Sequence, residues 1–153
     1  SYAVPTVETK KYLEESLSIA RKLNDHNCLS RVYVSQGVNE LLNNNYNSAQ
    51  SLLEQSLFEA RLAKNNWLIG VAIFEQARLA FFQLDYKSAH RLFEESLILV
   101  REVGELGRWA LGVSFLGAMS VDQGEWDSAR KYFEESQCGN QVYFFVHDGR
   151  KVR

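Results

Sequence analysis

The sequence predicts an all-α fold in which helical hairpins stack in a row, and three observations indicate it. A five-residue phrase recurs at a fixed spacing of 40 residues, apolar residues recur at helical spacing in two blocks per copy, and a short turn separates the blocks. A fixed period of this length is typical of a stacked repeat array. Such an array presents an extended surface, which favours binding over catalysis.

The repeated phrase contains a serine preceded by acidic or amide residues. Its four copies stand at residues 13–17, 53–57, 93–97 and 133–137, with the serines at Ser16, Ser56, Ser96 and Ser136. Neighbouring side chains on a helix point about 100° apart, so paired glutamates in the phrase cannot converge on one substrate. We therefore expect the glutamates to face solvent and the serines to pack against the next hairpin.

The apolar spacing places the elements. A leading helix is expected at 7–24, as the second half of a unit whose first half is missing. Three units follow it, so that the array occupies residues 1–138 and holds about seven helices; they span 28–64, 67–103 and 107–138. The first helices are expected near 28–43, 67–83 and 107–123, and the second helices near 46–64, 86–103 and 126–138. In the second helices the apolar residues follow an i, i+3, i+4, i+7 pattern.

The turn between the two helices of a unit contains helix-ending and helix-starting residue types. Asn45 and Asp85 are good N-caps for the helix that follows, whereas Glu125 is a weaker one. Gly124 suits the end of the helix before it. Small residues recur where helices must approach closely, and aromatic residues are expected to lie opposite the gaps: the small ones are Gly37, Ala77, Gly117, Ala49, Ala89 and Ala129, and the aromatic ones Tyr46, Tyr86 and Trp126.

These residues resemble the tetratricopeptide repeat family. The shared features are the small residue within the first helix, the aromatic residue that opens the second, and an alanine followed four residues later by a bulky apolar residue, as in Ala89 and Phe93. The resemblance implies a right-handed α-solenoid. The 40-residue period exceeds the usual length of about 34 residues. Gln36 and Gln76 replace the usual leucine, which is present at Leu116, and the closing proline is absent.

The phrase from Leu92 to Glu105 also resembles a long-repeat subgroup of this family. That subgroup forms the sensor arms of bacterial transcription activators and signal-transduction ATPases of the maltotriose-regulator type. It implies a regulatory parent protein, and the chain, which is already within a repeat near residue 8, is expected to be a piece of it.

Composition excludes several function classes. The net charge of −2 argues against direct binding of nucleic acid or an anionic membrane. No apolar run approaches the roughly 20 residues of a membrane span, and no signal peptide is visible. Two cysteines at non-equivalent positions, Cys28 and Cys138, indicate reduced thiols and a cytoplasmic protein.

The resemblance also implies a concave groove lined by the first helices. Transferred register by register, its positions are Arg31, Val34, Val38 and Leu42 in the first unit, Val71, Phe74, Arg78 and Phe82 in the second, and Leu111, Ser114, Ala118 and Asp122 in the third. Phe74 and Phe82 flank Arg78 at four residues on either side, and an exposed aromatic–arginine stripe is typical of binding hot spots. The alternative is that both phenylalanines belong to the core, with Arg78 paired to Glu75.

Other candidate sites are weaker. The turn from Asp25 to Cys28 offers metal-ligand types, but without a second cluster a plain inter-repeat loop is favoured. Gln36 and Gln76 stand at a register that should be buried, where they either hydrogen-bond along the stack or mark a place that admits a ligand. No catalytic constellation or cofactor motif is present, so we expect no enzyme, cofactor or metal.

The C-terminal segment, residues 139–153, departs from the repeat. The last helix is expected to stop near 138, and residues 142–146 resemble a strand. This segment either caps the open end of the array, forms an edge for self-association into a homo-oligomer, or lacks order.

The sequence as a whole predicts a non-catalytic module that binds a protein or peptide in its groove, as the sensor or scaffold part of a bacterial regulator. The alternatives are a structural spacer or self-association element, and a small-molecule-sensing arm of a transcription regulator.

Overall fold

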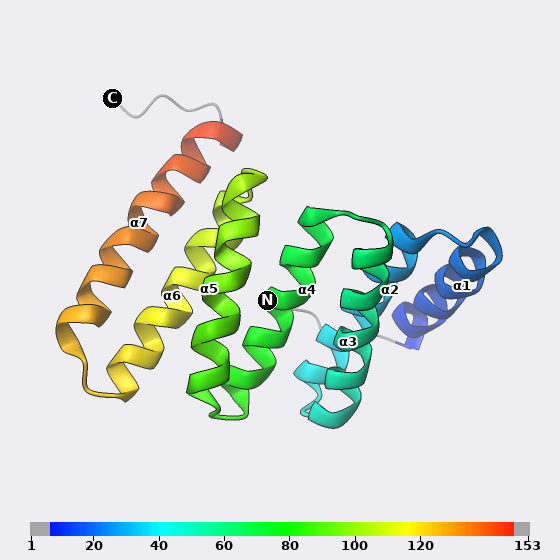
Figure 1. The fold of residues 1–153 in the computed structure, drawn as a ribbon, viewed down its shortest axis with the longest axis horizontal. Coiled ribbons are helices and arrows are strands. Elements are labelled where there is room, and N and C mark those ends of the chain that lie inside the picture. The colour runs from blue at the N-terminus through cyan, green and yellow to red at the C-terminus, as the bar shows by residue number, and fades with distance from the viewer. Residues whose placement is uncertain (1–6, 149–153) are drawn as a thin grey trace.

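The computed structural model describes the backbone of residues 7–148 and the side chains of residues 11–137. Within that part the chain forms seven helices and no strand: α1 Val7–Leu23, α2 His26–Leu42, α3 Tyr46–Leu62, α4 Asn66–Phe82, α5 Tyr86–Glu102, α6 Leu106–Asp122 and α7 Trp126–Asp148. Figure 1 shows them side by side in chain order, from α1 at one end to α7 at the other. The predicted all-α class and its seven helices are confirmed.

All six turns between the helices share one backbone design. The middle residue of each turn has a positive φ, from 51° at Asn24 to 79° at Gly104, and these residues recur every 20 positions: Asn24, Asn44, Lys64, Leu84, Gly104 and Gly124. In each turn two amides donate back to the end of the preceding helix, as Leu84 N does to Phe81 O (3.0 Å) and Asp85 N to Ala80 O (3.0 Å). This is the Schellman motif, which satisfies carbonyls that the helix end leaves free. The 40-residue sequence period therefore consists of two 20-residue helix-and-turn units.

The residue after each positive-φ position precedes the next helix, where an N-cap belongs. Asp25, Asn65 and Asp85 accept hydrogen bonds from the backbone N–H three residues on, at 3.0, 3.2 and 3.2 Å. Asn45, which we expected to cap α3 in the same way, makes no such bond. Asn45 occupies the expected N-cap position, but its side-chain amide donates to Glu40 Oε2 at 2.7 Å and makes no capping bond.

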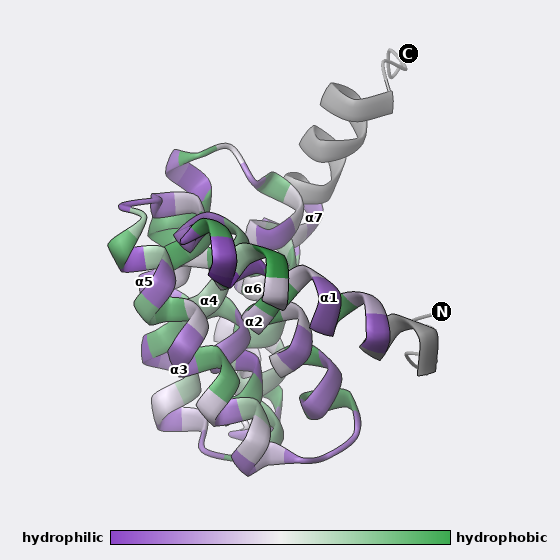
Figure 2. Cartoon of the chain, turned by 90° about the vertical axis from the view of Figure 1, so that its right-hand side faces the viewer, coloured by the Kyte–Doolittle hydropathy of each residue, from purple (hydrophilic) through white to green (hydrophobic). Residues whose placement is uncertain are grey.

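The helices pack as hairpins and then as a stack. α2 pairs with α3, α4 with α5 and α6 with α7, while α1 packs on α2, α3 on α4, α5 on α6 and α2 on α4. Figure 2 shows hydrophilic and hydrophobic residues together on the same helices, as expected of helices that are partly buried. The right-handed sense of a superhelix and membership of the tetratricopeptide family remain predictions.

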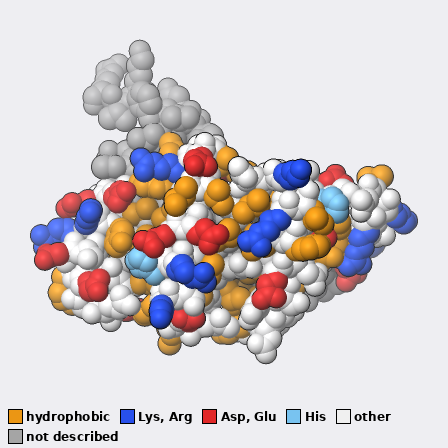
Figure 3. Space-filling model, in the orientation of Figure 1, with side chains coloured by type: hydrophobic (Ala, Val, Ile, Leu, Met, Phe, Trp, Pro, Cys, Tyr) orange, Lys and Arg blue, Asp and Glu red, His pale blue; other side chains and the backbone are white. Residues whose placement is uncertain are grey.

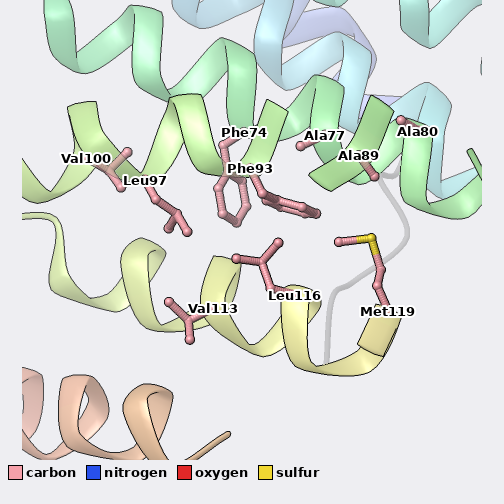
Figure 4. Close-up of a cluster of buried hydrophobic side chains, with 10 residues drawn as sticks. All are labelled: Phe74, Ala77, Ala80, Ala89, Phe93, Leu97, Val100, Val113, Leu116 and Met119. Carbon is pink, nitrogen blue, oxygen red and sulfur yellow. The ribbon is translucent and has the colours of Figure 1, made fainter. Parts of the chain in front are cut away.

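The largest hydrophobic cluster joins α4, α5 and α6 (Figure 4). Its buried members are Phe74, Ala77, Ala80, Ala89, Phe93, Leu97, Val100, Val113, Leu116 and Met119. Phe93 packs edge-on against Phe74, with ring centroids 5.4 Å apart, and stacks on Phe115 of α6 at 5.2 Å. Because the cluster includes both helices of one hairpin and the first helix of the next, it holds two hairpins together.

The small residues of the first helices allow close approach, as predicted, but to other partners. A Cβ added at Gly37 would lie 2.8 Å from Leu53 Cδ2, and one at Gly117 would lie 3.0 Å from Phe133 Cε1. The gaps are thus filled by the bulky residue of the repeated phrase. The aromatic residue that opens the second helix does not fill them, and Trp126 is 67% exposed.

The repeated serines bond within their own hairpin, which corrects the expectation that they pack against the next one. Ser56 Oγ donates to the Ser30 carbonyl at 2.9 Å, and Ser96 Oγ donates to the Gly70 carbonyl at 2.8 Å. The two acceptors are themselves 40 residues apart, so the first and second helices of a hairpin keep the same relative placement in both units. Ser136 instead donates to a carbonyl of its own helix. Ser16 is exposed, since no first helix of its hairpin lies within the described part of the chain.

The last helix does not stop near residue 138. α7 runs on to Asp148, so the expected strand at 142–146 is wrong, and with it the sheet edge proposed for self-association. A short apolar run does not distinguish strand from helix by periodicity, and one glycine within a helix costs only about 1 kcal/mol. The side chains of residues 138–148, including Cys138, and all of residues 149–153 lie outside the described part.

Candidate functional site

The predicted groove residues lie on α2, α4 and α6, but they do not form one continuous exposed surface. Val71 and Phe74 on α4 are buried, with 5% and 0% of their surface exposed. The expectation that they line an open groove is therefore wrong. For Phe74 the alternative is confirmed, since it packs in the core between α5 and α6.

Arg78 pairs with Glu75, as the alternative predicted. Its Nη1 lies 2.6 Å from Glu75 Oε2, and its side chain is only 13% exposed. Glu75 itself is nearly buried, with 5% exposed. A buried carboxylate needs such a partner, because removing it from water is costly unless a cation replaces the lost hydration.

A second guanidinium completes this cluster. Arg108 of α6 places Nη1 at 3.0 Å from Glu75 Oε1, and its guanidinium carbon lies 5.1 Å from the centre of the Phe74 ring. We call Glu75, Arg78, Arg108 and Phe74 the Glu75 cluster. It links α4 to α6 across the junction between two hairpins.

The Glu75 cluster carries more positive charge than negative. Two guanidinium groups face one carboxylate, and the Nε atoms of Arg78 and Arg108 are buried with no hydrogen-bond partner in the part of the chain the structure describes. Arg108 keeps 27% of its side chain exposed. An arginine that is held in place by a carboxylate and an aromatic ring and stays partly exposed can bind a carboxylate or a carbonyl of a partner.

The reasoning from sequence missed Arg108, although a signal for it exists. Residues 28, 68 and 108 share one register, where Cys28 and Leu68 precede Arg108. Glu75 likewise stands where the other units have Ser35 and Phe115. Charges at two registers that are uncharged in the other units mark the α4–α6 junction as different from the rest of the array.

The remaining predicted groove residues are spread along the stack. Arg31 is exposed at a hollow of about 320 Å³ between α1 and α2, which Ile19 and Leu23 also line. Val34 and Val38 are half-buried, whereas Phe82 is 44% exposed and packs edge-on against Phe81.

The third unit contributes two polar side chains that are already hydrogen-bonded. Ser114 donates to the carbonyl of Ala110 in its own helix at 3.0 Å. Asp122 accepts from the Tyr86 hydroxyl, and this bond raises the pKa of Tyr86 above its ordinary value of 10.0. Asp122 therefore ties α6 to α5, and Ser114 is bonded within α6, at positions where we expected free groups.

The turn from Asp25 to Cys28 has a structural use for each of its polar groups. Asp25 caps α2, and the hydrogen bond from the Cys28 amide lowers the pKa of its carboxyl below 3.8. His26 Nδ1 lies 2.6 Å from Glu59 Oε2 on α3, and Asn65 donates to Asn27 at 2.8 Å. The neighbouring Asp25 also raises the pKa of the Cys28 thiol, which disfavours the reactive thiolate.

Two further observations bear on function. Three or more His, Cys, Asp or Glu side chains do not come together in a geometry suited to a metal ion anywhere in the described residues. Over the same part of the chain, no helix has the length and apolar composition that crossing a bilayer requires.

On the face shown in Figure 3 acidic and basic side chains are interspersed, so recognition on that face depends on local clusters. The chain matches no model of a known protein family and no curated protein sequence.

Proposed function

We propose that this chain is a non-catalytic module that binds a protein or peptide through its first helices. In this proposal it is a tetratricopeptide-type segment of a larger cytoplasmic regulatory protein, where it serves as sensor or scaffold. The observation that carries the proposal is the Glu75 cluster, in which Arg78 and Arg108 share one carboxylate.

The cluster favours an acidic partner. Glu75 orients both guanidinium groups before any ligand arrives, so that little side-chain entropy is lost on binding. A carboxylate beside Arg108 would balance the excess positive charge of the cluster. Phe82, exposed one turn beyond Arg78 on the same helix, offers an apolar contact to a neighbouring residue of the ligand.

Arg108→Leu tests this function, because leucine already occupies the same register at Leu68. The variant keeps the Arg78–Glu75 pair and removes the excess charge. We expect the affinity for a labelled peptide rich in glutamate to fall on the order of tenfold, as for one lost charge-assisted hydrogen bond. Fluorescence anisotropy measures the affinity, and thermal unfolding shows that the variant is folded.

Arg130→Leu is the matched control, since Arg130 is exposed on α7 and far along the chain from the cluster. Equal losses in both variants would show general electrostatic attraction and contradict the proposed site. If no peptide binds the native chain at all, the structural spacer becomes the better assignment. A melting temperature raised by sugars but not by peptides would instead favour the small-molecule sensor.

A further inference from the structure

Two surface hollows of the array repeat with the 40-residue period. One lies among α1, α2 and α3 and has a volume of about 250 Å³; the other lies among α3, α4 and α5 and has a volume of about 390 Å³. Five pairs of equivalent residues line them: Glu14 and Glu54, Gln36 and Gln76, Asn39 and Leu79, Glu40 and Ala80, Leu52 and Leu92. The recurrence of the same lining shows that the hollow is a property of the repeat.

The third unit has apolar residues at the equivalent registers. Leu116, in the register of Gln36 and Gln76, is only 4% exposed, and Met119 is 1% exposed. Tyr132, in the register of Leu92, packs against the same cluster. A hollow is therefore found at both units that have glutamine in place of leucine. This favours the alternative in which these glutamines mark a place that admits a ligand over the one in which they hydrogen-bond along the stack.

A further hollow adjoins both of these. It is lined by Glu40, which also lines the first hollow, by Gln83, which also lines the second, and by residues 44–48 at the start of α3. The three hollows together pass around the N-terminal end of α3. We call the residues that line them the outer track.

The outer track is rich in amides and acidic groups. Its carboxylates are Glu14, Glu40, Glu54 and Asp85, and its basic side chain is Arg91. Its amides are Gln36, Asn39, Asn44, Asn45, Asn47, Gln50, Gln76 and Gln83. An amide side chain donates and accepts at once, so it can pair with the N–H and C=O groups of a peptide backbone.

We propose that the outer track binds an extended polypeptide segment that carries lysine or arginine side chains. The amides would pair with its backbone, and the carboxylates with its cationic groups. The first hollow is the more acidic of the two equivalent ones, since Ser51 stands where the second hollow has Arg91. The basic side chain of the partner is therefore assigned to the first hollow, beside Glu14 and Glu40.

This surface is separate from the Glu75 cluster. Gln76 lies two residues from both Phe74 and Arg78. At about 100° per residue, this places Gln76 on nearly the opposite side of α4 from both. The two surfaces also attract opposite charges. The inference therefore stands or falls independently of the proposed function, and the two can be tested with opposite probes.

The test uses a labelled eight-residue peptide of alternating lysine and serine, with its glutamate–serine counterpart as the comparison probe. Binding is followed by fluorescence anisotropy at low and at physiological salt. We expect the lysine peptide to bind and Glu14→Gln to weaken it on the order of tenfold. Gln36→Leu should weaken it similarly without lowering the melting temperature, because Leu116 shows that leucine suits this register.

Two further variants sharpen the test. Ser51→Arg gives the first hollow the basic residue of the second and should weaken the lysine peptide. Glu134→Gln is the matched control, because Glu134 has the register of Glu14 and is exposed on α7 but lines none of the three hollows. Arg108→Leu should leave binding of the lysine peptide unchanged, which distinguishes the outer track from the Glu75 cluster.

Three outcomes would overturn the inference. The lysine peptide fails to bind, or Glu134→Gln weakens it as much as Glu14→Gln, or Gln36→Leu leaves its affinity unchanged in the folded protein. Competition by spermidine at concentrations equal to those of the peptide would also overturn it, since that result would show an ammonium site without recognition of a polypeptide backbone.

Discussion

Leu84 occupies a backbone conformation that leucine rarely adopts. Its φ is 62°, in the left-handed region where a side chain crowds the following carbonyl, and the equivalent turns contain Asn24, Asn44, Lys64, Gly104 and Gly124. The side chain is 72% exposed, so it gains little from packing. The Schellman turn fixes this conformation because its two hydrogen bonds end α4 and position the cap of α5.

Replacing Leu84 with glycine should stabilise the protein. The relief of strain, about 1–2 kcal/mol, exceeds the extra conformational entropy that glycine loses, about 0.5–1 kcal/mol. We expect the free energy of unfolding to rise by about 0.5–1 kcal/mol, measured by urea denaturation. Leu84→Asn should give part of this gain, since asparagine tolerates the conformation at Asn44.

Gly104→Ala is the reverse control. A Cβ at Gly104 would meet no atom within 4 Å, so any loss of stability reports the backbone conformation alone. This variant should be destabilised. If Leu84→Gly were neutral or destabilising while Gly104→Ala cost nothing, the turn would not impose the strain that its φ implies.

At the scale of the element, the aspartate caps make helix stability depend on pH. The hydrogen bond to Ser88 lowers the pKa of Asp85 below its ordinary value of 3.8. The unfolded chain then binds more protons than the folded chain in this acidic range. The contribution of the cap is therefore present above about pH 4 and is lost as the pH falls through the folded pKa.

Asp85→Asn should remove part of this acid sensitivity. Asparagine caps α4 at the equivalent turn, where Asn65 accepts from Leu68 N at 3.2 Å, so the variant should still fold. We expect its urea midpoint to change less than that of the native chain between about pH 5 and pH 2. Parallel pH profiles for the two proteins would show that the Asp85 cap does not contribute to acid unfolding.

Much of each element could be predicted from the sequence, because period and turn residues act locally. The helix ranges from 7 to 123 follow from apolar spacing, and the ends follow from residues such as Asp85 and Gly124. The end of α7 could not be predicted in this way. The apolar residues at 142–146 favour strand and helix almost equally, and nothing local decides between them.

The candidate site was less predictable, because its residues meet across helices. Arg78 and Glu75 lie three residues apart on one helix, so their pairing could be expected. Arg108 reaches Glu75 only through the packing of α6 against α4 and α5. Burial of Phe74 likewise depends on Phe93 and on how closely α6 approaches, since Gly112 leaves room for the Phe74 ring.

At the scale of the whole molecule, the stack is held by contacts between neighbours, and burial is uneven along it. The cluster that joins α4, α5 and α6 is the largest, whereas α1 buries only Ala20 among its described side chains. Stability in such arrays is approximately a sum of unit and neighbour terms, so weakly packed ends open before the middle. The acidic first hollow lies at this weaker end, where α1 forms one wall.

Amide hydrogen exchange should therefore show a gradient, with fast exchange in α1 and the slowest in α4. Phe93→Ala should cost about 3–5 kcal/mol and raise exchange in α4, α5 and α6 together, because Phe93 is fully buried at their junction. Phe58→Ala is the control, since Phe58 is 61% exposed and should change little. Equal protection in α1 and α4 would show one cooperative unit in place of a neighbour-coupled stack. In that case a ligand in the first hollow would slow amide exchange equally in all helices. If exchange shows the gradient, the ligand should slow exchange most in α1.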